Sequence, residues 1–220
     1  AIQDMDESGV DVSVCLPIDY DFSHGSHSDI GIEEKHQHLA ELQEKYPGRI
    51  IGFAGPDPRR PGAPEMLARG IKEYGLKGLK LIPKAGYYMW QEDVYRLLDV
   101  AHELDVPVAA CTQPSGGGYN RTRFADPMHI DDAVSDFPDV KFIILHAGAP
   151  LMEFFEKALL AACRNHNVYL QFDFWIHGFF GVPKLIPNFT TDPEAVGRLL
   201  ARARDVIGAQ NMLYGTDTHS

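Results

Sequence analysis

Three side chains that could do acid–base or metal chemistry stand at the ends of apolar runs. His146 ends "KFIILH", Asp217 ends "MLYGTD" and Cys111 ends "VPVAAC". A histidine and an aspartate can bind a divalent ion or transfer a proton, and a thiolate is a good zinc ligand. Cys111 is equally compatible with a small buried hydrophobe, which is how most free cysteines behave. These residues can form a site only if the fold brings the ends of their runs together.

A second group of side chains could bind a substrate. Arg121 and Arg123 lie in "GGGYNRTRF", and arginine guanidinium groups match carboxylates in shape and charge. Lys80, in "GLKLIP", either binds an anionic substrate or pairs with a carboxylate of the protein, and we favour the pairing. Aromatic residues indicate an apolar pocket for a ring-containing substrate, or packing beneath loops. They are Tyr87, Tyr88, Trp90, Trp175, Phe179 and Phe180, and among them Trp175 is the candidate for substrate binding.

Four further histidines could contribute to a metal site. His24 and His27, in "SHGSHSD", follow the first apolar run, and a solvated loop is the favoured interpretation. His36 and His38 are two residues apart in "EEKHQHLAEL", which has a helical pattern. Residues two apart on a helix do not face each other, so we reject this pair as metal ligands.

Alternating apolar and amphipathic stretches predict the elements that must position these residues. One predicted helix places Val94, Leu97, Leu98 and Ala101 on a single face. The strands are predicted at 12–17, 50–54, 78–83, 106–111, 141–146, 168–172 and 212–217, and the helices at 33–46, 64–74, 91–104, 128–137, 151–165 and 193–206. Because the strand runs are continuously apolar and helices connect them, we expect a parallel sheet that is covered on its faces.

Two architectures satisfy this pattern, an open doubly wound sheet and a closed (β/α)8 barrel. The stretch after the first strand, "LPIDYDFSHGSHSD", lacks the GxGxxG fingerprint of the first architecture. A barrel usually needs about 250 residues, and seven strands are predicted here. We therefore expect one (β/α)8 TIM-barrel domain over residues 1–220, with strand one and the last helix outside this sequence. In such a barrel the carboxyl ends of the strands, and the loops after them, build the site.

An ordered set of motifs resembles a known family. The blocks "GLKGLKLIP", "DVPVAACTQPS", "ADPMHIDDAVSDFPD", "FPDVKFIILHAGAP", "NVYLQF" and "LYGTD" are similar to those of the amidohydrolase-related metal-dependent hydrolases. This family also contains decarboxylases of the aminocarboxymuconate-semialdehyde type. The resemblance runs from about Met5 to Asp217 and implies a TIM barrel with a divalent metal, for which zinc is our expectation.

The resemblance also implies roles for particular residues. Asp217 matches the metal-binding aspartate that ends strand eight of the family, and His146 matches the strand-six histidine, which acts on substrate or helps to hold a second metal. Cys111 stands where the family has its strand-five histidine ligand, so it could replace that ligand. The family's HxH pair on strand one has no counterpart before residue 24.

Composition limits the class of function. The formal net charge is -11, which offers no attraction to nucleic acid or to an anionic membrane surface. No apolar run approaches the roughly 20 residues that span a bilayer, and the acidic start does not look like a signal peptide. The three cysteines have no CxxC spacing, which suits the cytoplasm. We expect a small molecule as the partner, and a homodimer would be ordinary for such a barrel.

The leading hypothesis is a metal-dependent hydrolase that acts on a small, carboxylated molecule. A metal-activated water would be the nucleophile, Asp217 would bind the metal and accept the proton of that water, and His146 would polarise the attacked carbonyl. The alternative is a decarboxylase with the same barrel. A third hypothesis is a non-catalytic barrel that has lost its metal, because the HxH pair is not visible and Cys111 replaces a histidine.

Overall fold

The computed structural model describes residues 2–23, 28–114, 120–177 and 193–217, and of His177 the backbone alone. Strands and helices alternate along the chain, as expected for the α/β class. The strands are β1 (Ser13–Cys15), β2 (Ile50–Gly52), β3 (Leu79–Leu81), β4 (Val108–Cys111), β5 (Phe142–Leu145), β6 (Val168–Phe172) and β7 (Met212–Tyr214). The α-helices are α1 (Ile2–Glu7), α2 (Ile32–Lys45), α3 (Ala63–Lys72), α4 (Glu92–Glu103), α5 (Met128–Asp136), α6 (Met152–Arg164), α7 (Phe174–His177) and α8 (Pro193–Ile207). Within these ranges there are also four 3-10 helices, namely η1 (Pro83–Ala85), η2 (Thr122–Phe124), η3 (His146–Gly148) and η4 (Ala209–Asn211).

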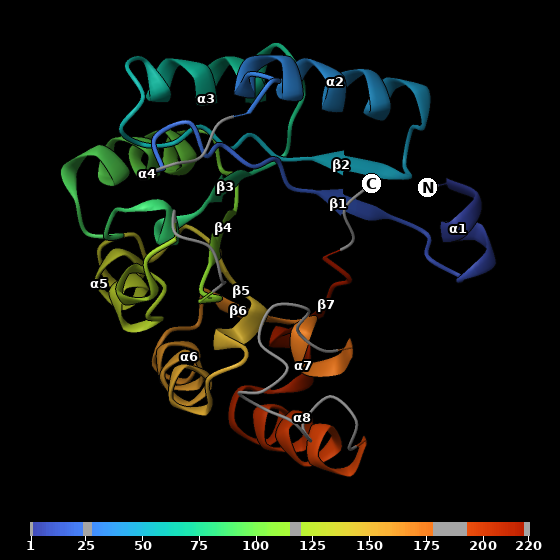
Figure 1. Cartoon of the computed structure of the whole chain (residues 1–220), viewed down its shortest axis with the longest axis vertical. Helices are drawn as coiled ribbons and strands as arrows, with labels where there is room; N and C mark the ends of the chain where they lie inside the picture. The colour runs from blue at the N-terminus through green and yellow to red at the C-terminus, as the bar shows by residue number, and fades with distance from the viewer. Residues whose placement is uncertain (1, 24–27, 115–119, 178–192, 218–220) are drawn as a thin grey trace.

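The strands follow one another around a curved parallel sheet in chain order (Figure 1). Strands β3 to β7 form one ladder and β1 pairs with β2, each pair in parallel. A single bridge between Ala54 and Leu79 joins the two ladders, and the Lys80 N–H donates to the Ala54 carbonyl at 2.7 Å. Within the described ranges, β1 and β7 each have a strand partner on one side only. The arrangement is an incomplete parallel barrel with helices outside it.

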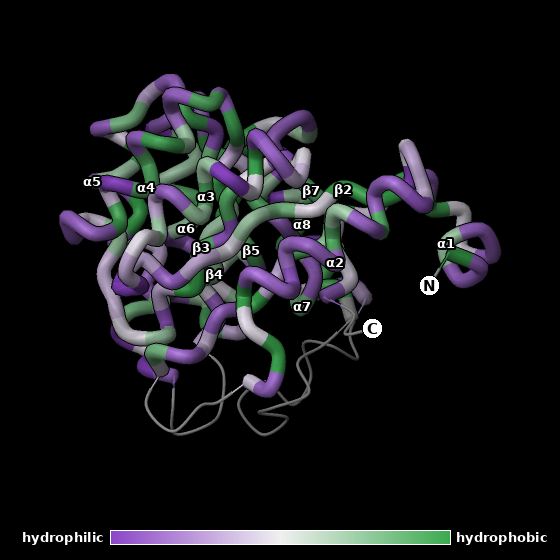
Figure 2. Tube along the Cα trace, turned by 90° about the horizontal axis from the view of Figure 1, so that it is seen from above, coloured by the Kyte–Doolittle hydropathy of each residue, from purple (hydrophilic) through white to green (hydrophobic). Residues whose placement is uncertain are grey.

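The core lies between the outer face of the sheet and the helices. The predicted face of α4 is confirmed, because Val94, Leu97, Leu98 and Ala101 are all fully buried. Hydrophobic segments gather along β3, β4 and β5 inside the molecule, whereas hydrophilic segments are frequent on the outer helices (Figure 2). Burial of these apolar faces is the main stabilising contribution.

The predicted strands and helices are confirmed, but several strands are shorter than expected. The run "MLYGTD" is a strand only as far as Tyr214, and His146 begins η3 instead of ending β5. The physical reason is backbone conformation, since φ is +67° at His146 and +47° at Asp217 and an extended strand requires negative values. Both functional candidates therefore lie just beyond the strands that carry them. Within the described ranges, every helix is too short or too polar to cross a membrane.

Candidate functional site

The carboxyl ends of five neighbouring strands bring together residues that are far apart in the sequence. Lys80 lies on β3, Cys111 ends β4, and His146, Asp173 and Asp217 follow β5, β6 and β7. His146, Asp173 and Asp217 each offer a ligand atom within 4.8 Å of those of the other two. We call these last three residues the central cluster. Its place at the carboxyl end of a parallel barrel is where enzymes of this architecture build their sites.

His146 and Asp173 form a buried pair at the bottom of the central cluster. His146 Nδ1 lies 2.7 Å from Asp173 Oδ2, and Asp173 is fully buried. Because an ionised carboxylate can only accept, Nδ1 carries the proton of this hydrogen bond. The other carboxylate oxygen, Oδ1, accepts the N–H of Phe174 at 2.6 Å. Asp173 therefore fixes the orientation of the imidazole and leaves Nε2 for a second interaction.

The backbone at His146 adopts a strained turn, which side chains located after β4 and β6 stabilise. His146, Ala147 and Gly148 have φ of +67°, +42° and +75°. For the two non-glycine residues this conformation costs on the order of 1–3 kcal/mol each. The indole N–H of Trp175 donates to the Ala147 carbonyl at 3.1 Å, and the Gly148 N–H donates to Thr112 Oγ1 at 3.0 Å. These hydrogen bonds help to hold the histidine at the end of β5.

Cys111 and His146 favour each other's charged forms. Burial works against the thiolate, but Lys84 and a hydrogen bond with His146 lower the pKa of Cys111 to about 5. Burial likewise opposes the imidazolium, but the Cys111 thiolate and the Asp173 carboxylate raise the pKa of His146 to about 9. At neutral pH His146 is therefore a protonated group in contact with two anions.

Two buried lysines make the neighbouring side of the site cationic. Lys80 and Lys84 are 7% and 6% exposed, and Lys84 Nζ donates to Gln113 Oε1 at 3.2 Å. Burial is the main cause that lowers the pKa of Lys80, and the charge of Lys84 adds to it, whereas the charge of the Cys111 thiolate acts in the opposite direction. No described carboxylate pairs with Lys80 at salt-bridge distance, although Asp217 and Asp173 act on it electrostatically. The favoured pairing of Lys80 with a carboxylate therefore stays a prediction.

The structure places two of the predicted site residues differently from expectation. Cys111 contacts His146 and lies outside the group of three ligand atoms, so its predicted role as a metal ligand stays a prediction. Trp175 is 1% exposed and packs against Phe155 at 5.5 Å between ring centroids. Its ring lies in the core of the described residues, and direct contact of Trp175 with a substrate stays a prediction. Trp175 contacts the site through the hydrogen bond from its indole N–H to the Ala147 carbonyl.

The arginine candidates lie beyond the end of β4, where Arg121 directly precedes η2 and Arg123 belongs to it. Arg121 and Arg123 are exposed, and the Arg121 backbone N–H donates to the Lys84 carbonyl at 2.9 Å. The guanidinium group of Arg123 lies over the Phe124 ring at 4.7 Å. Neither guanidinium group contacts a described residue of the central cluster, so their role in binding substrate stays a prediction.

The predicted aromatic pocket separates into two parts. Tyr87 is buried, and its hydroxyl accepts the N–H of Ile82 at 2.6 Å. Tyr88 and Trp90 stack at 4.8 Å, and Trp90 is half exposed. Phe179 and Phe180 lie outside the described residues.

Of the four other candidate histidines, two lie on α2 and two lie outside the described residues. His36 and His38 point differently from α2, because His36 is fully buried whereas His38 is exposed, which confirms their rejection as a pair. His36 Nε2 accepts the Gly55 N–H at 2.9 Å. His24 and His27 lie outside the described residues.

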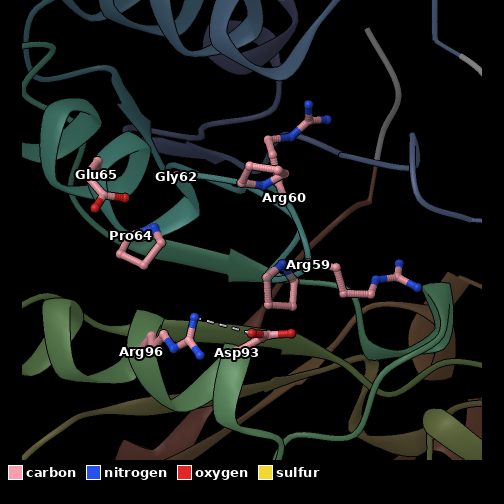
Figure 3. A pocket seen from close by; sticks show the side chains of 9 residues that line it. Arg59, Arg60, Gly62, Pro64, Glu65, Asp93 and Arg96 are labelled. Atoms are coloured by element: carbon pink, nitrogen blue, oxygen red, sulfur yellow. Dashed lines mark ion pairs between the residues drawn. The ribbon is translucent and has the colours of Figure 1, made fainter.

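A surface pocket between the β2–α3 connection and α4 is separate from the central cluster. It is lined by Pro58, Arg59, Arg60, Pro61, Gly62, Pro64, Glu65, Asp93 and Arg96 (Figure 3). The guanidinium groups of Arg59 and Arg60 extend away from one another and are engaged by Asp57 and Asp19. No residue of the central cluster lines this pocket, so we do not place the reaction there.

Two residues of the site were not predicted from the sequence, Asp173 and Lys84. Asp173 lies one residue beyond the predicted strand 168–172, and the same strand-end argument that selected His146 would have found it. Lys84 follows Pro83, which ends the predicted strand and begins η1. Its burial could not be read from the sequence, because lysines in connections are usually exposed.

The central cluster has the donor chemistry of a divalent-metal site. The two carboxylates are donors that zinc and manganese accept, and the imidazole of His146 becomes a donor only in its neutral form, without a proton on Nε2. Asp217 is exposed and makes no hydrogen bond with a described residue, so its oxygens are available. With His146 protonated, the carboxylates of Asp173 and Asp217 fit part of a metal shell, which needs four or more ligands when complete.

Comparison with solved structures shows the fold. An uncharacterised TIM-barrel protein of Bordetella bronchiseptica is 20% identical, with a TM-score of 0.67, and the match covers 98% of this chain and 68% of that one. A 5-carboxyvanillate decarboxylase of Novosphingobium aromaticivorans, crystallised with manganese and a nitrobenzoic acid, is 18% identical, with a TM-score of 0.66 and coverages of 98% and 68%. A 2,6-dihydroxybenzoate decarboxylase is 16% identical, with a TM-score of 0.66 and coverages of 98% and 75%. The TIM-barrel prediction is confirmed, and the chain spans about two thirds to three quarters of these proteins.

No curated protein matches the chain. The family model described as amidohydrolase matches residues 2–218, almost the whole sequence. The predicted resemblance is confirmed, and the chain belongs to the amidohydrolase 2 family, whose TIM-barrel fold it shares with the decarboxylases named above.

Proposed function

We propose that this chain is part of a divalent-metal-dependent decarboxylase that acts on a small carboxylated molecule. The observation that carries the proposal is the juxtaposition of the buried Lys80 and Lys84 with the His146–Asp173 pair. A decarboxylase must bind an anion and then deliver a proton to carbon, and this site offers groups for both tasks. The similarity of the fold to two decarboxylases supports the same reaction.

The lysines supply the binding step. Two ammonium groups beside one another in a buried site repel each other and are poorly solvated, as the lowered pKa of Lys80 reflects. A substrate carboxylate would relieve both penalties at once. The substrate class is therefore a small carboxylic acid, with Arg121 and Arg123 as further candidate contacts at the mouth.

His146 supplies the proton. When the bond between the carboxyl carbon and its neighbour breaks, carbon dioxide leaves and the electron pair stays on the neighbouring carbon. The Nε2 proton of the imidazolium is transferred to that carbon, and Asp173 stabilises the charged form before the transfer. The raised pKa of His146 keeps this proton in place at neutral pH.

Asp217 would hold the metal, because its carboxylate is exposed toward the site and unpaired among the described residues. A bound zinc or manganese ion would supply Lewis acidity that orients and polarises the substrate anion. Asp217→Asn should therefore lower the metal content and reduce the rate by at least about 100-fold, or roughly 2.7 kcal/mol. Asp205→Asn, which alters an exposed carboxylate on α8, is the control.

The direct test is carbon dioxide release by protein loaded with manganese or zinc. The first acids to assay are 2,6-dihydroxybenzoate and 5-carboxyvanillate, followed by other hydroxybenzoates and short enol acids. Release that depends on metal and is lost in His146→Gln supports the proposal. Stoichiometric metal without carbon dioxide from any acid of this set would refute it.

Hydrolysis is the second candidate, and the exposed Asp217 favours it. A free carboxylate at the mouth could accept the proton of an attacking water. Turnover of amides or lactones without carbon dioxide would identify this reaction. Metal content below about a tenth of an equivalent after growth with added zinc and manganese would instead indicate a barrel without catalysis.

A further inference from the structure

Gln171 lies at the centre of the contacts between the strands that carry the central cluster. It belongs to β6, between β5 and β7, and is 9% exposed. Its Oε1 accepts the backbone N–H of His146 at 2.8 Å. Its side chain also hydrogen-bonds Asp173, and because a carboxylate can only accept, the amide Nε2 is the donor. One side chain thus contacts both members of the buried pair.

The same amide group meets β7 on its other side. Gln171 is in register with Leu213, and its side chain lies directly over Gly215. A Cβ atom at Gly215 would overlap Nε2 and would lie 2.8 Å from Cδ of Gln171. The backbone two residues before Asp217 is therefore in close contact with the amide that holds His146 and Asp173.

We infer that Gln171 is a positioning residue that sets the placement of Asp217 relative to the His146–Asp173 pair. The inference rests on the proposed function for its catalytic meaning, but the contacts themselves do not. The site needs an acceptor for the His146 N–H and a donor for the Asp173 carboxylate at the end of one flexible stem. Glutamine has both, whereas glutamate lacks the donor, methionine lacks a comparable donor and acceptor, and asparagine is one methylene shorter.

Three variants separate these contacts. Gln171→Met keeps the length and removes both hydrogen bonds, Gln171→Glu keeps an acceptor for His146, and Gly215→Ala forces the amide away. Leu170→Val is the matched control, because Leu170 is the fully buried neighbour on β6 whose side chain points to the opposite face of the sheet. It should lower stability without touching the central cluster.

Two measurements are made on each complete protein, the hydrogen-exchange rate of the His146 amide by NMR and the dissociation constant for Mn²⁺. Gln171→Met should speed exchange by at least tenfold and weaken Mn²⁺ binding by at least tenfold. In Gln171→Glu the His146 amide should exchange at close to the wild-type rate. Gly215→Ala should weaken Mn²⁺ binding by at least tenfold. Leu170→Val should change neither measurement by more than about twofold.

Equal Mn²⁺ affinity in wild type, Gln171→Met and Gly215→Ala would overturn the inference, as would fast exchange in Gln171→Glu. If Gln171→Met does not fold, Gln171→Glu and Gly215→Ala decide the matter by the same measurements. If wild type binds neither Mn²⁺ nor Zn²⁺, the proposed function is refuted, and the exchange rates alone decide whether Gln171 positions His146.

Discussion

At the scale of single residues, His146 depends on the charges around it. Asp173 and Cys111 raise its pKa from 6.5 to about 9, against the effect of burial. A group whose pKa is raised on folding contributes stability that is complete below its unfolded value, and this stability is lost as the pH rises through the folded value. The contribution of His146 is therefore full below about pH 6.5 and disappears around pH 9.

This dependence gives a prediction for Asp173→Asn in metal-free protein. The variant should be less stable than wild type at pH 6.5, by several degrees in unfolding midpoint, because the imidazolium loses its carboxylate partner. The gap should narrow as the pH is raised from 6.5 to 10. Thermal unfolding over this range checks it, and a gap that stays constant or widens would contradict the assignment of a raised pKa.

Lys80 illustrates a conflict between stability and binding. Since burial and Lys84 lower the pKa of Lys80, its charge destabilises the folded protein at neutral pH. Lys80→Met should raise the unfolding midpoint by a few degrees. The same change should weaken the binding of a carboxylated inhibitor by about tenfold or more, which corresponds to roughly 1.4 kcal/mol of binding free energy. Lys77→Met, at an exposed position of the same segment, is the control and should change neither the unfolding midpoint nor the affinity for the inhibitor. An unchanged affinity in Lys80→Met would remove Lys80 from the substrate site.

At the scale of elements, η3 is the segment on which the site depends most. Its left-handed residues would relax without the partners that other strands provide. Trp175→Phe removes the donor to the Ala147 carbonyl and leaves space in the core, so we expect a loss of about 1–3 kcal/mol. Trp90→Phe, at a half-exposed position, should cost less than about 0.5 kcal/mol. Equal losses in the two variants would show that the Trp175 hydrogen bond is unimportant.

The elements themselves could be predicted from the sequence, because strand and helix periodicity is local. The apolar face of α4 is an example, with all four predicted residues buried. His146 and Asp217 could also be predicted, since a polar residue at the end of an apolar run marks the mouth of a parallel barrel.

Contacts between strands could not be predicted in the same way. The hydrogen bonds of Gln171 join β6 to β5, and whether Trp175 faces the core or the mouth depends on the short helix α7, which carries no clear periodic signal. The positive φ at His146 is likewise a product of tertiary contacts, because histidine has no intrinsic need for it.

At the scale of the whole molecule, sheet order and chain order coincide. Each strand pairs with the next from β3 to β7, so the carboxyl ends that carry Lys80, Cys111, His146, Asp173 and Asp217 are adjacent around the barrel. The site residues are therefore close together because their strands are neighbours in the sheet, and no connection has to cross the barrel to bring them together. Changes on the outer helices should act on the site only through the strands.

The one-sided pairing of β1 and β7 has a consequence for handling the protein. Each strand presents unpaired backbone groups within the described ranges, flanked by apolar side chains such as Val14, 52% exposed, and Tyr214, 67% exposed. Such edges can template the addition of a foreign strand. For the 220 residues taken alone, without the further strand that we expect between these edges, we expect reversible self-association that strengthens at high salt, where the net charge of -11 is screened, and that Val14→Lys suppresses. Analytical ultracentrifugation at two salt concentrations would reveal this self-association, and a monomer at both would show that these strand edges do not associate.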